Sequence, residues 1–487
     1  MSNYLIQYYR CPEHYVRLAL KGALSTTSGY FRFGENTICY GRYCGRRPSA
    51  SPAEALADAH ADIRLENGTA FLPFDLAQVA DNLRHELYAA NGNGPYLQSL
   101  MKRMYYCVRP LLPVGVRKHL QRIHLNGWQH ARFPHWPVDR SVDSMFEQLL
   151  LLALRAQGVA RIPFVWFWPE GAASCAFMTH DVETARGKDF CATLMDIDDS
   201  FGIKASFQIV PECRYEVTPA YLDSIRKRGF EIALQDLNHD GHLFRNRREF
   251  RARAARINAY GRQWGTRGFR TAVLYRRQEW FDDLEFSYDM SVPNVAHLDP
   301  QRGGCCTIMP YFIGNLLELP LTTTQDYSLF HILNDYSIDL WKRQTALIMQ
   351  KHGLVSFIIH PDYITSNRER HIYEALLAHL SALRAENGLW VTTPAEVNRW
   401  WRQRMEMRII EDGDHLRIDG PGKERGRIAY ASEQDGRLVF TLNEAPANES
   451  AGLRTEQVFE EPRTRSLSDS TGFSGTLQEI LGLNRAL

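Results

Sequence analysis

The chain has 487 residues, 44% of them hydrophobic and 23% charged, so it is long enough for two or three domains and apolar enough to build a core. Its formal net charge of +1 gives no electrostatic basis for binding nucleic acid or an anionic membrane, and we expect neither as a partner. No uncharged apolar run is long enough to span a membrane. The composition leaves the oligomeric state open.

The cysteines and the N-terminus indicate the compartment. Nine cysteines are scattered along the chain, a pattern typical of reduced thiols in a cytosolic protein. Cys39 and Cys44 have the spacing of half a zinc site, but no second pair follows, and packing is the favoured interpretation. The first residues lack a basic segment followed by an apolar one, so no secretory signal is apparent and we expect a cytoplasmic location.

Residues 1–170 are expected to form an N-terminal α+β domain whose role the sequence does not indicate. Two short runs of aromatic and β-branched residues over 30–41 predict a hairpin with its turn at 34–36. Helical composition follows in four segments, at 53–65, 76–90, 116–125 and 143–157.

Residues 171–404 alternate short apolar strands with helices, each strand usually preceded by a glycine turn. The strands are predicted at 175–179, 204–210, 230–234, 268–273, 316–320, 355–360 and 389–392. The helices are predicted at 188–201, 219–228, 248–264, 336–351 and 368–386. This rhythm predicts a parallel sheet or barrel, and about 230 residues suit a single one.

The C-terminal part of the chain changes character. Alternating segments separated by Asp-Gly and Pro-Gly turns predict a small β-module at 405–443. The remaining residues, 444–487, are polar and predict a disordered tail, apart from a short helix near 477–487.

Polar side chains with catalytic capacity follow several of the predicted barrel strands. The first strand ends in Asp181 and Glu183, and their i, i+2 spacing places both carboxylates on one face of a strand. Arg270 follows the fourth strand, and His360 follows a later one. Active sites of βα-barrels lie at the C-terminal ends of the strands. Each residue alone also has an ordinary structural interpretation, but their coincidence in one barrel favours a site.

The order and context of these segments resemble the polysaccharide deacetylase family, also called the NodB-homology family or carbohydrate esterase family 4, over roughly residues 174–400. The family's first motif, commonly Thr-Phe-Asp-Asp-Gly, is similar to Thr-His-Asp-Val-Glu at 179–183, a His-Asp-Val-Glu variant. The resemblance implies an α/β fold with a distorted (β/α) NodB-like barrel. It also implies that Asp181 is the catalytic base and that Glu183 is the metal-binding carboxylate, because Val182 occupies the usual position.

The second motif, His-Ser/Thr-x-x-His, departs from the family pattern. Aligning the strand at 231–233 places Gln235 at the first His position and His239 at the second. Two imidazoles and one carboxylate form a ligand set with open positions for water and substrate, whereas Gln is a weak neutral oxygen ligand. Gln235 is therefore expected to weaken metal binding. His242 lies three residues beyond His239 and substitutes only if the loop curls back.

The remaining motifs supply an arginine and a general acid. Phe-Arg-Thr-Ala at 269–272 resembles the third motif, Arg-x-Pro, without its proline, and implies that Arg270 orients Asp181. The fifth motif, Leu-x-His, matches 358–360 and implies that His360 protonates the leaving amine. The fourth motif is not distinct. Asp289, in Tyr-Asp-Met-Ser, and Asp326, which could orient His360, are both candidates.

The resemblance implies a metal-dependent hydrolase that removes N-acetyl groups from an amino sugar or glycan precursor. The expected cofactor is a divalent metal, zinc first and cobalt or nickel next, and the expected partner is a carbohydrate. Two alternatives stay open: an inactive barrel that binds carbohydrate or a biosynthetic partner, and a metal-free amidohydrolase. Gln235 and Val182 favour the inactive barrel, whereas the base, the ligands and the acid that remain argue against it.

Overall fold

A curled sheet of nine strands lies at the centre of the region that the sequence predicts to be a barrel. The computed structural model describes residues 4–90, 127–299, 301–413 and 415–442. Along the sheet the strands are β12 (Tyr311–Ile313), β13 (Leu316–Glu318), β11 (Tyr288–Asp289), β10 (Gly268–Arg270), β9 (Glu231–Gln235), β8 (Ser206–Ile209), β7 (Ser174–Val182) and β14 (Leu354–Ile359). The ninth, β15 (Leu389–Thr392), pairs with the first half of β7.

Neighbouring strands of this sheet run parallel, with the exception of β12, which pairs antiparallel with β13. The two ends of the path, β12 and β14, do not pair with each other, so the sheet is a half-barrel. Every residue of β7 is buried, as expected for a parallel strand covered on both faces. The predicted mixed α/β class is confirmed.

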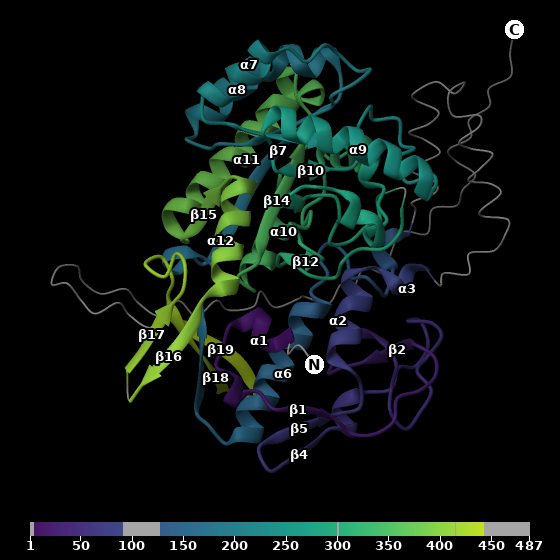
Figure 1. Cartoon of the computed structure of the whole chain (residues 1–487), viewed down its shortest axis with the longest axis vertical. Coiled ribbons are helices and arrows are strands. Elements are labelled where there is room, and N and C mark those ends of the chain that lie inside the picture. The colour runs from purple at the N-terminus through teal and green to yellow at the C-terminus, as the bar shows by residue number, and fades with distance from the viewer. Residues whose placement is uncertain (1–3, 91–126, 300, 414, 443–487) are drawn as a thin grey trace, which may run out of the picture. The chain divides into compact units, whose positions relative to one another are not determined.

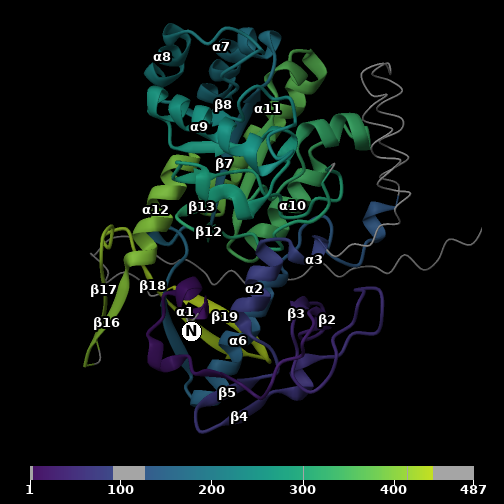
Figure 2. The same ribbon diagram turned by 45° about the vertical axis from the view of Figure 1, so that its right-hand side comes forward.

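Helices connect the strands and lie around the outside of the sheet (Figures 1 and 2). They are α7 (Ala185–Ser200), α8 (Pro219–Lys227), α9 (Arg247–Trp264), α10 (Asp339–Met349), α11 (Asn367–Glu386) and α12 (Pro394–Glu406). Side chains that cap the helix N-termini set three of the starts, because Thr184, Thr218 and Asn246 each accept a backbone N–H from the first turn. The predicted helices of this region are confirmed to within three residues at each end.

The cap of α7 allows a first prediction. Thr184 Oγ1 accepts the N–H of Gly187 at 3.0 Å, directly after Glu183. Thr184→Ala removes this acceptor and is expected to lower the free energy of unfolding by about 1 kcal/mol, measured by urea denaturation. Thr184→Ser keeps the hydroxyl and serves as the matched control. Equal stability of the Ala and Ser variants would show that the cap contributes nothing.

The described part of the N-terminal region carries short strands and four α-helices before the first barrel strand. The elements are α1 (Tyr4–Tyr9), β1 (Leu18–Leu20), β2 (Gly29–Arg32), β3 (Ile38–Gly41), β4 (Arg64–Glu66), β5 (Thr69–Leu72), α2 (Leu76–Arg84), α3 (Leu87–Ala90), α6 (Ser141–Gln157) and β6 (Arg161–Val165). The predicted hairpin is confirmed as the antiparallel pair β2–β3.

The helix predicted at 53–65 is wrong. The side chain of Asp58 accepts the N–H of His60, which closes a single 3₁₀ turn over Ala59–Asp62. Strand β4 follows at once and pairs antiparallel with β5. Side-chain capping and strand pairing therefore outweigh the helical composition of this segment. The helix predicted at 76–90 is split into α2 and α3, and Glu86 between them has a φ of +59°.

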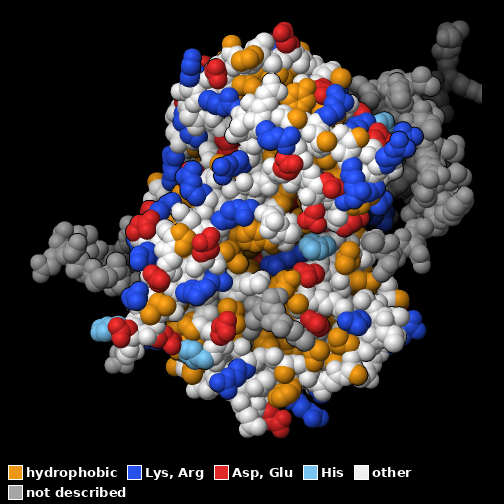
Figure 3. Space-filling model, viewed as in Figure 1, with side chains coloured by type: hydrophobic (Ala, Val, Ile, Leu, Met, Phe, Trp, Pro, Cys, Tyr) orange, Lys and Arg blue, Asp and Glu red, His pale blue; other side chains and the backbone are white. Residues whose placement is uncertain are grey.

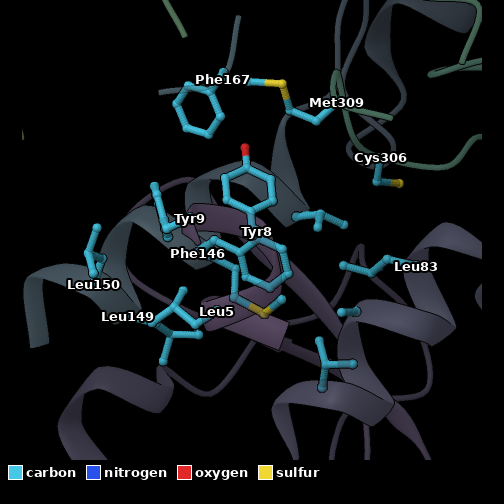
Figure 4. Close-up of a cluster of buried hydrophobic side chains, with 14 of the residues drawn as sticks. Leu5, Tyr8, Tyr9, Leu83, Phe146, Leu149, Leu150, Phe167, Cys306 and Met309 are labelled. Atoms are coloured by element: carbon cyan, nitrogen blue, oxygen red, sulfur yellow. The ribbon is translucent and has the colours of Figure 1, made fainter. Parts of the chain in front are cut away.

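The core of this region forms where α6 packs against α1. Phe146 of α6 and Tyr8 of α1 meet edge to face, with 4.8 Å between their ring centroids. Leu5, Leu149 and Phe146 are fully buried around this contact (Figure 4). The apolar run of α6, residues 149–154, is buried on every side of the helix, because all six consecutive residues are buried. No helix of the described ranges has the length and hydrophobicity to cross a membrane.

The C-terminal strands occur where the sequence predicts them. Strands β16 (Arg408–Asp412) and β17 (His415–Asp419) form one hairpin, and β18 (Ile428–Gln434) pairs with β19 (Arg437–Leu442). Strand β18 also pairs antiparallel with β6, a partner far away in the chain that the sequence does not indicate. The segment predicted as helical at 116–125 and the predicted tail at 444–487 lie outside the described residues.

The surface and the cysteines agree with the composition. Basic and acidic side chains both occur across the face shown in Figure 3, as a net charge of +1 suggests. Eight of the nine cysteines lie in the described ranges, and none of these eight forms a disulfide.

Candidate active site

The ends of parallel strands bring the predicted polar residues to one edge of the sheet. Asp181 is the penultimate residue of β7, and Glu183 follows that strand directly. Gln235 and Arg270 are the last residues of β9 and β10, and these two are register partners. His360 follows β14, which pairs with β7. Asp181 and His360, which are 179 positions apart in the chain, are thus neighbours in space because their strands end at this edge.

Asp181 and Arg270 form a buried ion pair. Arg270 Nη1 lies 2.5 Å from Asp181 Oδ1, and the two side chains are 1% and 5% exposed. The same nitrogen donates to Thr179 Oγ1 at 2.8 Å, and Arg270 Nε donates to the Met290 carbonyl at 3.0 Å. Three groups, from β7 and from the residue after β11, therefore hold the guanidinium, which in turn fixes one oxygen of Asp181.

Three nitrogens converge on a single oxygen of Glu183. Glu183 Oε1 lies 2.7 Å from His239 Nε2, 3.1 Å from Gln235 Nε2 and 3.5 Å from His360 Nε2. Gln235 Nε2 also donates to Asp181 Oδ2 at 3.1 Å, so this amide bridges the two carboxylates. The Glu183 carboxylate is the point at which the predicted ligands and the predicted acid meet.

The loops around Glu183 are held by their own contacts. Tyr215 Oη donates to the Val182 carbonyl at 2.6 Å, and Arg214 Nε donates to the Glu183 carbonyl at 2.7 Å. After β9, Asp236 and His239 have φ values of +50° and +56°, which non-glycine residues rarely adopt. These two left-handed residues turn the loop so that His239 faces Glu183.

The close packing of charges fixes protonation states. Burial raises the pKa of the Glu183 carboxyl, but the imidazoles of His239 and His360 outweigh burial and hold this pKa well below its usual range. Burial lowers the pKa of His239, and the Glu183 carboxylate more than reverses this shift, so the His239 pKa is raised. Glu183 is therefore an anion at neutral pH, as a metal ligand must be.

Asp326 holds His360 in place. Asp326 Oδ1 lies 2.6 Å from His360 Nδ1, and Oδ2 accepts the backbone N–H of His360 at 2.6 Å. Burial lowers the pKa of His360, but Asp326 and Glu183 outweigh it and raise this pKa well above its ordinary value. The Tyr363 ring packs on the imidazole with centroids 4.7 Å apart. The imidazole is therefore protonated at neutral pH, with Nε2 directed at Glu183.

The donor atoms at this edge fit a divalent cation. One possible ligand atom each from Asp181, Glu183 and His360 lie within 4.8 Å of one another, and His360 Nε2 could bind a cation only with the imidazole in its neutral form. His239 adds a second imidazole beside Glu183, and Gln235 Oε1 is buried with no hydrogen-bond partner among the described residues. Turning the Gln235 amide by 180° exchanges its nitrogen and oxygen, so that Oε1 faces the carboxylates of Asp181 and Glu183. A cation there could bind this amide oxygen and one oxygen of each carboxylate. Carboxylate, amide and imidazole ligands suit zinc and its neighbours.

Two of the weaker candidates lie elsewhere. His242 has a side chain that is 61% exposed, and its nearest charged partner is Asp240, 3.7 Å away, so the loop does not curl back to the site. Asp289 is fully buried at the end of β11, where it accepts the N–H and the hydroxyl of Ser291. It lies behind Arg270 rather than beside Glu183.

Several residues that hold the site in place belong to no motif that predicts this role. Thr179 lies inside the first motif but reads as an ordinary strand residue. Tyr215 and Arg214 contact only the backbone at 182–183, which no motif records. Tyr363 lies three residues after His360, in the 3₁₀ turn Pro361–Tyr363. Pro361 is the feature of the sequence that indicates a turn here.

Solved structures with similar folds cover about half of the chain. A protein of Mycobacterium smegmatis assigned as a polysaccharide deacetylase is 17% identical, with a TM-score of 0.40, and the match covers 49% of this chain and 93% of that chain. An allantoinase is 12% identical, with a TM-score of 0.37 and coverage of 48% and 92%. A family 4 acetyl xylan esterase from Clostridium thermocellum, solved with a cobalt ion, is 14% identical, with a TM-score of 0.30 and coverage of 47% and 91%.

Neither the models of known protein families nor the curated proteins give a match to this chain. The likenesses are thus to solved structures, at low identity and over part of the length. The chain is similar, over about half of its length, to solved structures of the polysaccharide deacetylase kind.

Proposed function

We propose that this chain is a metal-dependent hydrolase that removes N-acetyl groups from an amino sugar or glycan precursor. The observation that carries the proposal is the convergence on Glu183, where His239, Gln235 and His360 lie within 3.5 Å of one carboxylate oxygen. Asp181, fixed by Arg270, lies beside this cluster. A carboxylate base, an imidazolium acid and a cation site in one cluster are the groups that amide hydrolysis requires.

Asp181 is the proposed general base. Its Oδ1 is held by Arg270, so Oδ2 is the oxygen that accepts a proton from the attacking water. Glu183, His239 and Gln235 are the proposed ligands of a divalent cation. Such a cation would polarise the amide carbonyl and lower the pKa of a water molecule. The low pKa of Glu183 supports this role, since an anionic ligand is needed.

His360 is the proposed general acid. Its Nδ1 faces Asp326, which leaves the Nε2 proton for the nitrogen of the leaving amine. The raised pKa keeps this proton in place until the carbon–nitrogen bond breaks. Asp326 thus orients the ring and stabilises its charged form, as a carboxylate does in other His–carboxylate pairs.

One observation favours a second candidate, amide hydrolysis without a metal. The Gln235 Nε2 group donates to both Asp181 and Glu183 at 3.1 Å, so a neutral amide takes the bridging position between two carboxylates. In this arrangement Asp181 and His360 would act alone as base and acid. Dependence of the rate on added metal separates the two candidates.

The test is the release of acetate from a panel of N-acetylated amino sugars, nucleotide-linked sugars and oligosaccharides. We expect turnover that rises with added zinc, cobalt or nickel, falls with a chelator and is lost in His239→Ala. The His242→Ala variant, with its imidazole exposed and outside the site, is the matched control and should keep full activity. A rate of acetate release that changes neither with added metal nor with chelator would support the metal-free candidate.

If none of the substrates in the panel releases acetate, the deacetylase proposal is contradicted and a barrel that only binds carbohydrate is favoured. The cytoplasmic location is likewise a proposal. It is checked by fractionation of cells that produce the protein, and recovery outside the cytoplasmic membrane would overturn it.

A further inference from the structure

Two buried carboxyl groups lie side by side behind the candidate site. Asp289 and Glu318 end the neighbouring parallel strands β11 and β13 and are register partners. Both residues are 0% exposed, and as register partners on neighbouring strands their carboxyl groups lie within hydrogen-bonding reach of each other. Two carboxyl groups can hydrogen-bond only when one of them carries a proton, since an ionised carboxylate has no donor. At least one of the two carboxyl groups therefore carries a proton, and the donors around them decide which one.

The surroundings place the proton on Glu318. Asp289 Oδ2 accepts the N–H of Ser291 at 3.0 Å, and Oδ1 accepts the Ser291 hydroxyl at 2.8 Å. Glu318 Oε1 accepts one N–H, from Val292 at 2.9 Å, whereas Oε2 receives no N–H or hydroxyl donor from the described residues. An ionised oxygen buried without a donor is costly, whereas a protonated one donates to Asp289.

The charge on Asp289 acts on Arg270 through the segment 289–291. Ser291 Oγ, held by Asp289, accepts the N–H of Thr271, directly after Arg270. The Met290 carbonyl accepts a hydrogen bond from the Nε–H group of Arg270. The Asp289 carboxylate also attracts the guanidinium electrostatically. The segment thus holds the backbone and the side chain of Arg270 at once, and Arg270 in turn fixes Asp181.

We propose that Glu318 and Asp289 form a proton-sharing carboxyl pair that positions Arg270 against Asp181, with the proton on Glu318 and the charge on Asp289. The other ionisable groups that face the pair are Arg270, Arg276, Cys305 and Tyr311. Burial raises the pKa of the Cys305 thiol and of the Tyr311 phenol, so both are neutral. The charged groups are the two guanidinium groups, and that of Arg276 is paired with the Glu86 carboxylate. The activity readouts below rest on the proposed function, but the spectroscopic one does not.

The direct test is infrared spectroscopy of the whole protein at neutral pH. A buried carboxylic acid has a C=O stretching band separate from those of ionised carboxylates. We expect the wild-type spectrum minus the Glu318→Gln spectrum to contain one such band, and labelling glutamate side chains with ¹³C in the wild type to shift it. The labelled wild type needs no variant to fold. Absence of a glutamic acid band there, or its persistence in Glu318→Gln, would overturn the proposal.

The role in positioning is tested by turnover. Glu318→Leu removes the donor to Asp289 and is expected to reduce kcat at least tenfold with little change in KM, whereas Glu318→Gln restores a donor and is expected to rescue most of the loss. Asp289→Asn should also shift the pH profile, because it removes a charge facing Arg270. Equal activity of the Leu and Gln variants would contradict the positioning role. If the infrared band is found but no variant or wild type releases acetate, the proposed function fails and the pair stands.

Discussion

Asp181→Asn is expected to reduce acetate release by a factor of about 10²–10⁴, because the amide cannot accept a proton from water. The same change leaves the Arg270 guanidinium, which is 1% exposed, without its anionic partner. Breaking a buried ion pair from one side typically costs about 3–5 kcal/mol. We therefore expect a lower free energy of unfolding as well, measured by urea denaturation alongside turnover.

The combined loss of turnover and of stability distinguishes Asp181→Asn from the loss of an exposed ion pair. Glu285→Gln breaks the ion pair with Arg262, in which the side chains are 61% and 62% exposed, and should alter neither turnover nor stability. Full activity of Asp181→Asn would show that Asp181 is not the base. Reduced activity with unchanged stability would show that Arg270 finds another partner.

Asp326→Asn is expected to move the alkaline limb of the kcat/KM profile to lower pH. His360 must carry a proton to act as the acid, and its raised pKa means that activity falls only as the pH passes above that value. Removing the Asp326 charge lowers the His360 pKa, so the proton is lost earlier. Above the new pKa, turnover falls about tenfold for each unit by which the pKa drops.

The measurement combines pH profiles of turnover with an NMR titration of the His360 imidazole. Asp240→Asn is the control, because Asp240 pairs with Arg253 in the loop after β9 and does not contact His360. Its profile should match that of the wild type. An Asp326→Asn profile with an unmoved alkaline limb would contradict the assignment of His360 as the acid.

The alternation of strands and helices could be predicted because each parallel strand is a short apolar run bounded by glycine turns. The structure extends the first predicted strand, 175–179, to Ser174–Val182, and so carries it through Asp181. Pairing between distant segments could not be predicted, since β18 meets β6 across more than 260 residues of sequence. The helix expected at 53–65 fails for a local reason, the turn that Asp58 closes.

The site residues that directly follow a strand could be predicted from the sequence, whereas those in longer loops could not. Asp181, Glu183, Arg270 and His360 each follow a strand, and parallel strands end at one edge, so their proximity follows from the fold class. His242 shows the limit, because loop geometry decides where a residue beyond the strand points. Glu318 shows another limit, because an acid within an apolar strand carries no sign of the partner it meets.

The central claim is that Glu183 and its neighbours hold a divalent metal in a hydrolytic site. The most direct test is the metal content of protein purified without chelator, for the wild type and for the Glu183→Ala, His239→Ala and His242→Ala variants. We expect near-stoichiometric metal in the wild type and in His242→Ala, and its loss in the other two. Protein that takes up no metal, even with added zinc, cobalt or nickel, would contradict the claim.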